Sequence, residues 1–282
     1  MYQNRAVGYL GFKNARFGKI DAHIATCAYA REALQKASAI AESRSFQIIH
    51  GIVDSLWLRK ENASEQEYHS LCREIETALE LPISFEGTYK WIVFLNSRTN
   101  PHVPVLNRYY GVLQDGTMKV RGIDLRRHDT PDIVRDCQRE TLTLLSCASN
   151  STEFRELIPQ ALEITRKYIR LIRDCQVPAE KLVLEKRLSK SPEEYKSLSH
   201  QAIAAQQLHK EGRYVHAGQN INYIVTADRA TVQSNRAVPS ELFEESTGYD
   251  TEAYVKLLIA SFVNLFLPLG YDTSLVKEIL QT

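Results

Sequence analysis

The sequence predicts an α+β fold, in which an antiparallel sheet with helices is followed by a mainly helical part. Two observations along the 282 residues carry this prediction. Before Thr130, the sequence contains short apolar or alternating runs, which are typical of strands. Between them lie segments whose apolar residues recur at helical spacing. After Pro131, apolar residues recur mainly at helical spacing. We therefore expect one part over residues 1–130 and a second over residues 131–282.

The first part opens with helix and hairpin patterns. An apolar stripe predicts a helix from residue 15 to about residue 43. The runs 46–52 and 56–58 flank a short polar break, which predicts a hairpin with Asp54 at or near its turn. A second amphipathic helix is expected over residues 65–79.

Further strands and then helices follow. Alternating runs on both sides of Asp115-Gly116 predict another hairpin, because Asp-Gly favours the tight turns that join antiparallel strands. A strand over residues 83–95 precedes it. The second part is expected to hold helices over 132–148, 152–174, 199–211, 254–267 and 274–280, with short strands over 182–188 and 221–227.

Composition excludes several classes of protein. The formal net charge is +1, so any contact with nucleic acid must come from a local basic cluster. Five scattered cysteines without C-x-x-C spacing argue against a disulfide framework or a zinc site. No apolar run approaches the ~20 residues that span a bilayer, so we expect no membrane segment and a cytoplasmic location.

Four stretches carry a family resemblance by their order along the chain. They are GYLGFKNARFGKIDAHIATCAYARE, IIHGIVDSLWL, FEGTYKWIVFL with VLNRYYGVL, and VRGIDLRRHDTPDIVRDCQRE. Together they resemble family B DNA polymerases of archaea. Further on, VPAEKLVLEKRL, EEYKSLSHQAIAAQQL, INYIVT and RAVP follow in the order of the family's thumb elements, so the resemblance covers almost the whole chain. It implies the end of a polymerase palm over residues 1–130 and a thumb over residues 131–282.

The resemblance implies nucleotide-binding and catalytic positions. Asn4 and Gly8 match the end of the family's K-x-x-x-N-S-x-Y-G nucleotide-binding motif. Asp54 matches the second carboxylate of Y-G-D-T-D-S, a catalytic Mg²⁺ ligand, whereas Ile52 replaces the first carboxylate. Two magnesium ions need several shared carboxylates, so Mg²⁺ is expected only in a complete assembly. Without the resemblance, Asp54 would be a solvated turn residue.

The resemblance also implies contacts with primer–template DNA. Arg108 and Tyr110 match the family's K-K-x-Y motif, with Asn107 at a lysine position. Arg121 and Arg127 match the family's R-G-x-x-x-x-R-R-D segment at the entry to the thumb, and Arg126 belongs to the same local basic cluster. Lys196 and His200 lie in thumb-like sequence. Such side chains hold phosphates without reading sequence. The alternative is a solvated strand face with arginines that extend their charges into water.

Two functional hypotheses follow. The chain is a C-terminal portion or subunit of a DNA-directed DNA polymerase, inactive alone, whose partner is an N-terminal part that supplies exonuclease, fingers and the motif A carboxylate. Alternatively, it is a catalytically inactive DNA-binding scaffold, because Ile52 and Val53 depart from the catalytic motif. A truncated reading frame of a longer gene is a third possibility.

Overall fold

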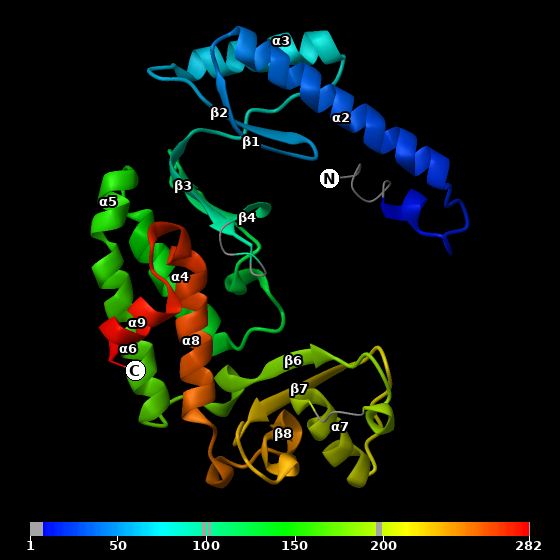
Figure 1. Ribbon diagram of the computed structural model, residues 1–282, viewed down its shortest axis with the longest axis vertical. Coiled ribbons are helices and arrows are strands. Elements are labelled where there is room, and N and C mark those ends of the chain that lie inside the picture. The colour runs from blue at the N-terminus through cyan, green and yellow to red at the C-terminus, as the bar shows by residue number, and fades with distance from the viewer. Residues whose placement is uncertain (1–7, 98–99, 101–102, 196–198, 282) are drawn as a thin grey trace. The chain divides into compact units, whose positions relative to one another are not determined.

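The computed structural model describes residues 8–97, 100, 103–195 and 199–281. The chain forms two compact units, Met1–Thr88 and Tyr89–Thr282 (Figure 1). Helices and small antiparallel sheets alternate in both, which confirms the predicted α+β class. The predicted change from strand-rich to mainly helical sequence near Thr130 falls inside the second unit. The division into palm and thumb at that point stays a prediction.

The first unit packs two helices against a hairpin. Helix α2 (Ile20–Ser43) contacts α3 (Glu65–Leu79) and both strands of the hairpin, β1 (Gln47–Ile52) and β2 (Ser55–Arg59). The fully buried core is small and consists of Ala37, Ala41, Phe46, Leu71 and Ile75.

Local sequence signals account for the ends of these helices. Ser64 and Glu67 form a capping box, in which each side chain accepts the other's backbone N–H, and α3 begins where the sequence predicts. Helix α2 begins at Ile20, later than the expected residue 15. The backbone N–H groups of Ala15 and Gly18 donate to Phe12 and Ala15 in successive turns, which occupy the chain before the helix.

The second unit begins with a three-stranded antiparallel sheet. Its order is β3 (Tyr89–Asn96), β4 (Pro104–Leu113) and β5 (Met118–Arg121). The predicted hairpin joins β4 to β5. Gly116 adopts a φ of +86°, and the Asp115 carboxylate accepts the Thr117 N–H at 2.8 Å, so both turn residues serve the turn as expected.

Four helices then form a bundle beside this sheet. They are α4 (Asp132–Ser146), α6 (Ile158–Arg173), α8 (Thr251–Phe266) and α9 (Thr273–Leu280). The long helix expected over residues 152–174 is two helices, because α5 (Ser151–Glu156) ends before α6 begins. Pro159, in the first turn of α6, cannot donate to the Arg155 carbonyl, which breaks the helical ladder here.

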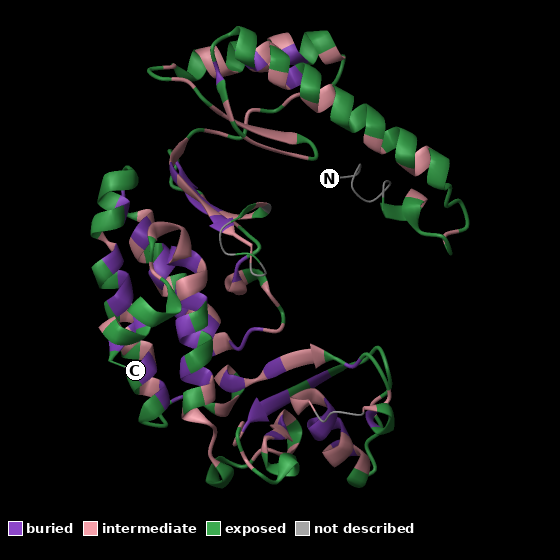
Figure 2. Ribbon diagram, viewed as in Figure 1, coloured by how far each residue is buried: buried purple, intermediate pink, exposed green. Residues whose placement is uncertain are grey.

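A second sheet lies between α6 and α8 in the sequence. Strands β6 (Leu184–Arg187), β7 (Asn220–Val225) and β8 (Ala237–Pro239) pair antiparallel in that order, and α7 (His200–Lys210) packs on β7 and β8. One continuous hydrophobic core joins both sheets and the helical bundle of the second unit (Figure 2).

Helix α8 supplies the centre of this core. The segment Thr251–Leu269 has the length and apolarity of a membrane-crossing helix. Its large apolar side chains are buried within the unit, among them Val255, Leu258, Phe262 and Phe266. Packing inside a protein core therefore accounts for its apolarity.

Val53 is strained at the tip of the β1–β2 hairpin. Its φ is +54°, a region that β-branched residues rarely adopt. Because Asn tolerates this conformation, Val53→Asn is expected to stabilise the hairpin by about 1 kcal/mol. Hydrogen exchange of the β1 and β2 amides should then slow about 5-fold. Val232→Asn is the control, since Val232 is equally exposed but has no positive φ; faster exchange in Val53→Asn would contradict the strain.

Candidate nucleic-acid interface

Asp54 occupies the exposed turn of the β1–β2 hairpin. Ile52 ends β1 and pairs with Ser55 of β2, so Val53 and Asp54 form the two-residue turn. The Asp54 N–H lies 2.6 Å from the Ile52 carbonyl oxygen. Asp54 therefore lies in the turn beyond the end of β1, where the hairpin pattern predicts it.

The carboxylates present do not fit a magnesium pair. Within the described ranges, no three His, Cys, Asp or Glu side chains gather closely enough to hold a metal ion. Position 52 carries an isoleucine, which has no oxygen ligand to offer. Asp54 as a catalytic residue and metal ligand stays a prediction for a larger assembly.

The end of β5 and the 3₁₀ turn η1 (Asp124–Arg126) present two exposed arginines. Arg121 is the last residue of β5 and Arg126 the last of η1, and neither forms an ion pair with another described residue. Gly122, between them, has a φ of +66°. A Cβ there would lie 2.7 Å from the Asn107 carbonyl oxygen, so this close approach of strands requires glycine.

Arg108, on β4, directs its guanidinium into the protein. It donates to the carbonyl of Gly122 at 3.0 Å, to the carbonyl of Asn96, and to the Asn264 side chain on α8. Burial lowers the pKa of this guanidinium, and the charge of Asp124 opposes that effect. The three hydrogen bonds to Gly122, Asn96 and Asn264 hold the partly buried guanidinium inside the protein, which favours a structural role for Arg108.

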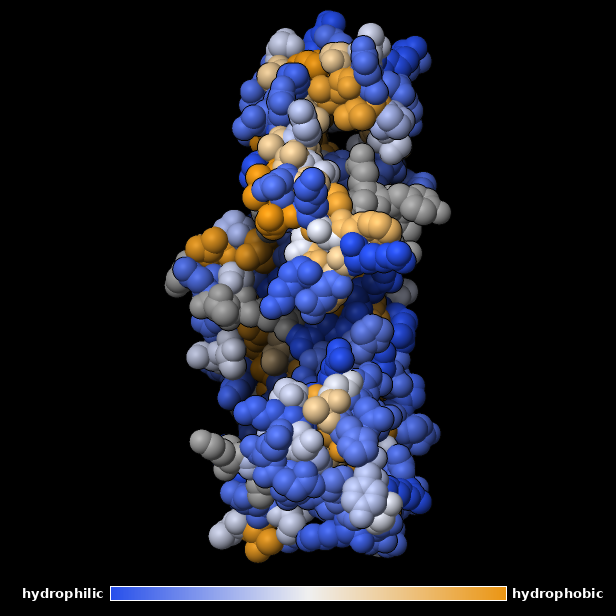
Figure 3. All heavy atoms as spheres, turned by 90° about the vertical axis from the view of Figure 1, so that its right-hand side faces the viewer, coloured by the Kyte–Doolittle hydropathy of each residue, from blue (hydrophilic) through white to orange (hydrophobic). Residues whose placement is uncertain are grey.

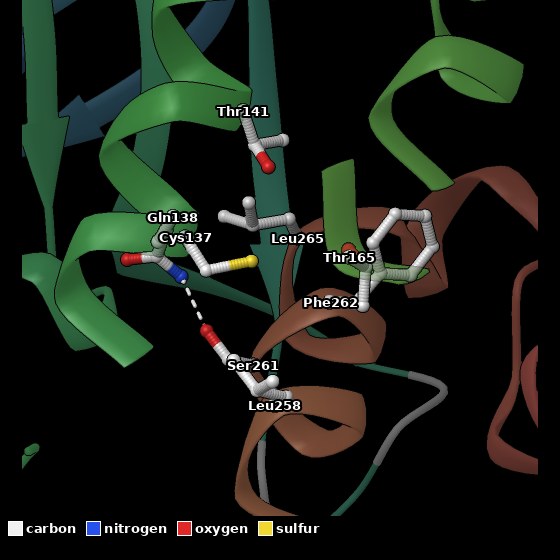
Figure 4. A pocket seen from close by; sticks show the side chains of 8 residues that line it. All are labelled: Cys137, Gln138, Thr141, Thr165, Leu258, Ser261, Phe262 and Leu265. Atoms are coloured by element: carbon white, nitrogen blue, oxygen red, sulfur yellow. Dashed lines mark hydrogen bonds between the residues drawn. The ribbon is translucent and has the colours of Figure 1, made fainter. Parts of the chain in front are cut away.

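Asp124 is the carboxylate of the same cluster, and its side chain is 15% exposed. It accepts the Asn264 amide at 3.1 Å and a hydrogen bond from Ser261. Burial raises the pKa of Asp124, and these hydrogen bonds from Asn264 and Ser261 oppose the rise. Gln138 of α4 donates to the Ser261 hydroxyl at 2.9 Å (Figure 4). It also accepts the Leu125 N–H at 2.6 Å.

Tyr110 belongs to the core. Its side chain is fully buried, its ring contacts Trp91, and its hydroxyl donates to the Leu265 carbonyl at 3.0 Å. Burial raises the pKa of this phenol. Because no part of the side chain reaches the surface, we assign Tyr110 to the packing of β4 on α8 and not to contact with DNA.

Arg127 is held in an ion network. Its guanidinium donates two hydrogen bonds, of 2.7 and 2.6 Å, to the Asp129 carboxylate, which also accepts from Lys186 of β6. These contacts join the segment after η1 to the second sheet. The hydrogen bonds from Arg127, and then Lys186, hold the pKa of Asp129 well below its usual range.

The remaining predicted site residues lie apart from this cluster. His200 begins α7, and its Nε2 lies 3.0 Å from an Asp228 carboxylate oxygen. Gly8 is exposed, and open space surrounds its Cα. Asn4 and Lys196 fall outside the described residues. Roles of these four in binding nucleotide or DNA stay predictions.

Sequence reasoning missed Asn264 and Gln138, which organise the cluster. Gln138 is 2% exposed within an amphipathic helix. Asn264 interrupts the apolar run of α8, and a polar amide in such a run is the one signal in the sequence that a buried partner exists.

The Asp129 network predicts a pH-dependent stability. Because its pKa is depressed on folding, the contribution of Asp129 is present above the unfolded pKa of about 3.9 and lost as pH falls toward the folded pKa. Asp129→Asn should therefore lower the free energy of unfolding by about 1 kcal/mol at pH 7, since the pair is partly solvated. The difference from wild type should shrink below about pH 4.

Urea unfolding at several pH values measures this difference. Glu163→Gln, which removes an exposed ion pair with Arg166 on α6, is the control and should change little. A deficit for Asp129→Asn that is constant across this range would contradict the linkage.

Comparisons with known proteins identify relatives of this chain. The family model for DNA polymerase family B matches residues 4–269. The DNA polymerase of Archaeoglobus fulgidus is 26% identical over 245 residues, which cover 87% of this chain and 29% of that protein. DNA polymerase 2 of Saccharolobus solfataricus is 31% identical over 150 residues, 53% of this chain and 22% of that protein.

The fold agrees with a solved structure. The family B DNA polymerase from Pyrobaculum calidifontis matches with a TM-score of 0.65 at 23% identity, over 95% of this chain and 33% of that chain. This chain thus spans about a third or less of the length of these relatives. With the family model matched over nearly its whole length, the chain belongs to DNA polymerase family B.

Proposed function

We propose that this chain is the C-terminal palm-and-thumb portion of a DNA-directed DNA polymerase and that it binds primer–template DNA. The observation that carries the proposal is the pair of exposed arginines, Arg121 and Arg126, on a segment tied to the core of a family B chain. Arginines without a carboxylate partner are suited to holding phosphates, which positions a duplex without reading its sequence.

Nucleotidyl transfer requires a further, N-terminal part in this proposal. Asp54 is a single exposed carboxylate with no metal-binding group around it among the described residues. A polymerase site needs several carboxylates to share its divalent ions. The N-terminal part would supply the missing ligands, with exonuclease and fingers, either in the same polypeptide or in a separate one. We place this function in the cytoplasm.

An exposed apolar surface supports such a partner. The apolar stripe of this surface is formed by Ile20 and Ile24, one turn apart on the N-terminal half of α2, and the two side chains are 59% and 56% exposed. Phe12 and Phe17 precede them and are also exposed. Hydrophobic side chains reach the surface of this unit in Figure 3 as well. Exposed apolar side chains gathered in this way mark a contact surface.

The second candidate is a catalytically inactive DNA-binding scaffold. The isoleucine at position 52 favours it, because that side chain removes one of the two motif C carboxylates even in a complete assembly. Both candidates share duplex binding through the second unit, and they differ in whether an assembled polymerase extends a primer.

Removal of the exposed arginines should weaken duplex binding. Arg121→Ala and Arg126→Ala are each expected to reduce affinity for a primer–template duplex several-fold and to lower the slope of log K against log salt by about 1. Fluorescence anisotropy across a salt series, in EDTA, measures both quantities. EDTA should leave wild-type binding unchanged, because the phosphate contacts need no metal.

Arg139→Ala is the matched control. Arg139 is 59% exposed on α4 and already paired with Asp136, so its loss should leave affinity and slope unchanged. Absence of salt-dependent binding by the wild-type chain would contradict the proposed function, and an equal loss in all three variants would contradict the assigned residues.

Reconstitution tests the proposed partner. The chain is mixed with the N-terminal part of the same organism's family B polymerase. Ile20→Ser with Ile24→Ser should weaken this association at least 10-fold, since burial of each side chain contributes about 1.5–3 kcal/mol. Tyr214→Ser, which alters an exposed residue of the second unit, should have no effect.

Primer extension by the same mixture separates the two candidates. Extension by the pair, and not by either part alone, supports the polymerase portion. Assembly with duplex binding but no extension supports the scaffold. Association that is unaffected by the Ile20 and Ile24 substitutions would contradict the assigned surface.

A further inference from the structure

We infer that Asn264 is a positioning residue for the DNA-binding segment from Arg121 to Arg127, although it lies far from that segment in the sequence. This inference rests on the proposed duplex binding and deepens it. Asn264 touches no DNA in this account; it acts through the buried partners that fix the segment.

The segment is irregular and needs an external support. β5 ends at Arg121, Gly122 takes a positive φ, and η1 is a single 3₁₀ turn whose internal backbone hydrogen bonds are those of Arg126 and Arg127 to Ile123 and Asp124. Such short elements do not hold a conformation alone. Contacts from other elements therefore determine where the two exposed arginines lie.

Asn264 provides the link with partners on both sides. Its amide oxygen accepts from the Arg108 guanidinium, 156 residues earlier in the chain, and its amide nitrogen donates to the Asp124 carboxylate at 3.1 Å. Arg108 in turn donates to the Gly122 carbonyl at 3.0 Å. One side chain on α8 thus fixes the segment both at Gly122 and at Asp124.

A parallel path runs through Gln138. The Gln138 amide nitrogen donates to Ser261, one helical turn before Asn264 (Figure 4). The Gln138 amide oxygen accepts the Leu125 N–H. Gln138 and Ser261 are 2% and 6% exposed. Because water cannot replace these partners, loss of one leaves a buried polar group without a hydrogen bond, and the structure must shift to satisfy it.

The charges explain why an amide is suited to this position. Asn264 lies between a guanidinium and a carboxylate, and only a side chain that both accepts and donates can satisfy both. A leucine of similar size satisfies neither. An aspartate satisfies Arg108 but sets a second carboxylate against Asp124, where two buried like charges repel.

Asn264→Leu tests the inference. It is expected to reduce duplex affinity about 10-fold and to lower the salt slope by about 1, as if a phosphate contact were lost. In the free protein, amide exchange over residues 122–127 should quicken about 10-fold. Thr165→Val is the matched control, because it removes a buried hydroxyl that bonds within α6, in the same bundle.

A charge-swapped double variant distinguishes loss of positioning from simple misfolding. Asn264→Asp should weaken binding, and Asn264→Asp with Asp124→Asn should restore it to within about 2-fold, since the swapped pair again matches donors with acceptors. Thermal unfolding confirms that the compared variants are folded.

The outcomes distinguish this inference from the proposed function. Unchanged affinity and unchanged exchange in Asn264→Leu, while Arg121→Ala weakens binding, would overturn the positioning role alone. Equal losses in Asn264→Leu and Thr165→Val without a change of slope would reduce it to a structural role and overturn it too. A wild-type chain that binds no duplex would overturn both.

Discussion

The Asp124 carboxylate is largely withdrawn from water among helices α4 and α8 and strand β4. Removing an ionised carboxylate from water costs several kcal/mol unless hydrogen bonds and nearby charges compensate. Here the compensation comes from Asn264, Ser261 and the charge of Arg108. Asn264 and Ser261 sit on α8, far from Asp124 in the sequence, whereas Arg108 lies on β4. Arg127, whose guanidinium lies 3.9 Å from the Asp124 carboxylate, follows η1 directly. The hydrogen bonds and charges around the Asp124 carboxylate therefore connect the sheet, the 3₁₀ turn and the helical bundle. Arg121 and Arg126 remain exposed at the edge of this arrangement.

The two units differ in how completely they bury their apolar side chains. The second unit has one continuous core that spans two sheets and a helical bundle. Among its described residues, from Gly8 on, the first has five buried hydrophobic residues and a helix whose N-terminal half exposes apolar side chains. A small core combined with exposed apolar side chains supports the further protein part that the proposed function requires. This contrast is consistent with a chain that spans only part of the length of its polymerase relatives.

Local signals in the sequence predicted most of the fold. The Asp54 and Asp115-Gly116 turns, the capped start of α3 and the helix after Pro131 all depend on residues close in sequence. The site was less accessible to such reasoning. Arg108 and Tyr110 looked like surface residues in a motif, yet their partners Asn264 and Leu265 lie 156 and 155 residues away. No local pattern indicates contacts of that range.

The most direct test is photo-crosslinking from the backbone of a primer–template duplex, with azidophenacyl groups on its phosphorothioates and no divalent metal present. The account predicts crosslinks to peptides that contain Arg121 and Arg126, and none to the exposed outer face of α6. Crosslinks confined to α6, or no crosslink to residues 119–128 when the duplex is bound, would contradict the claim that this segment holds the DNA.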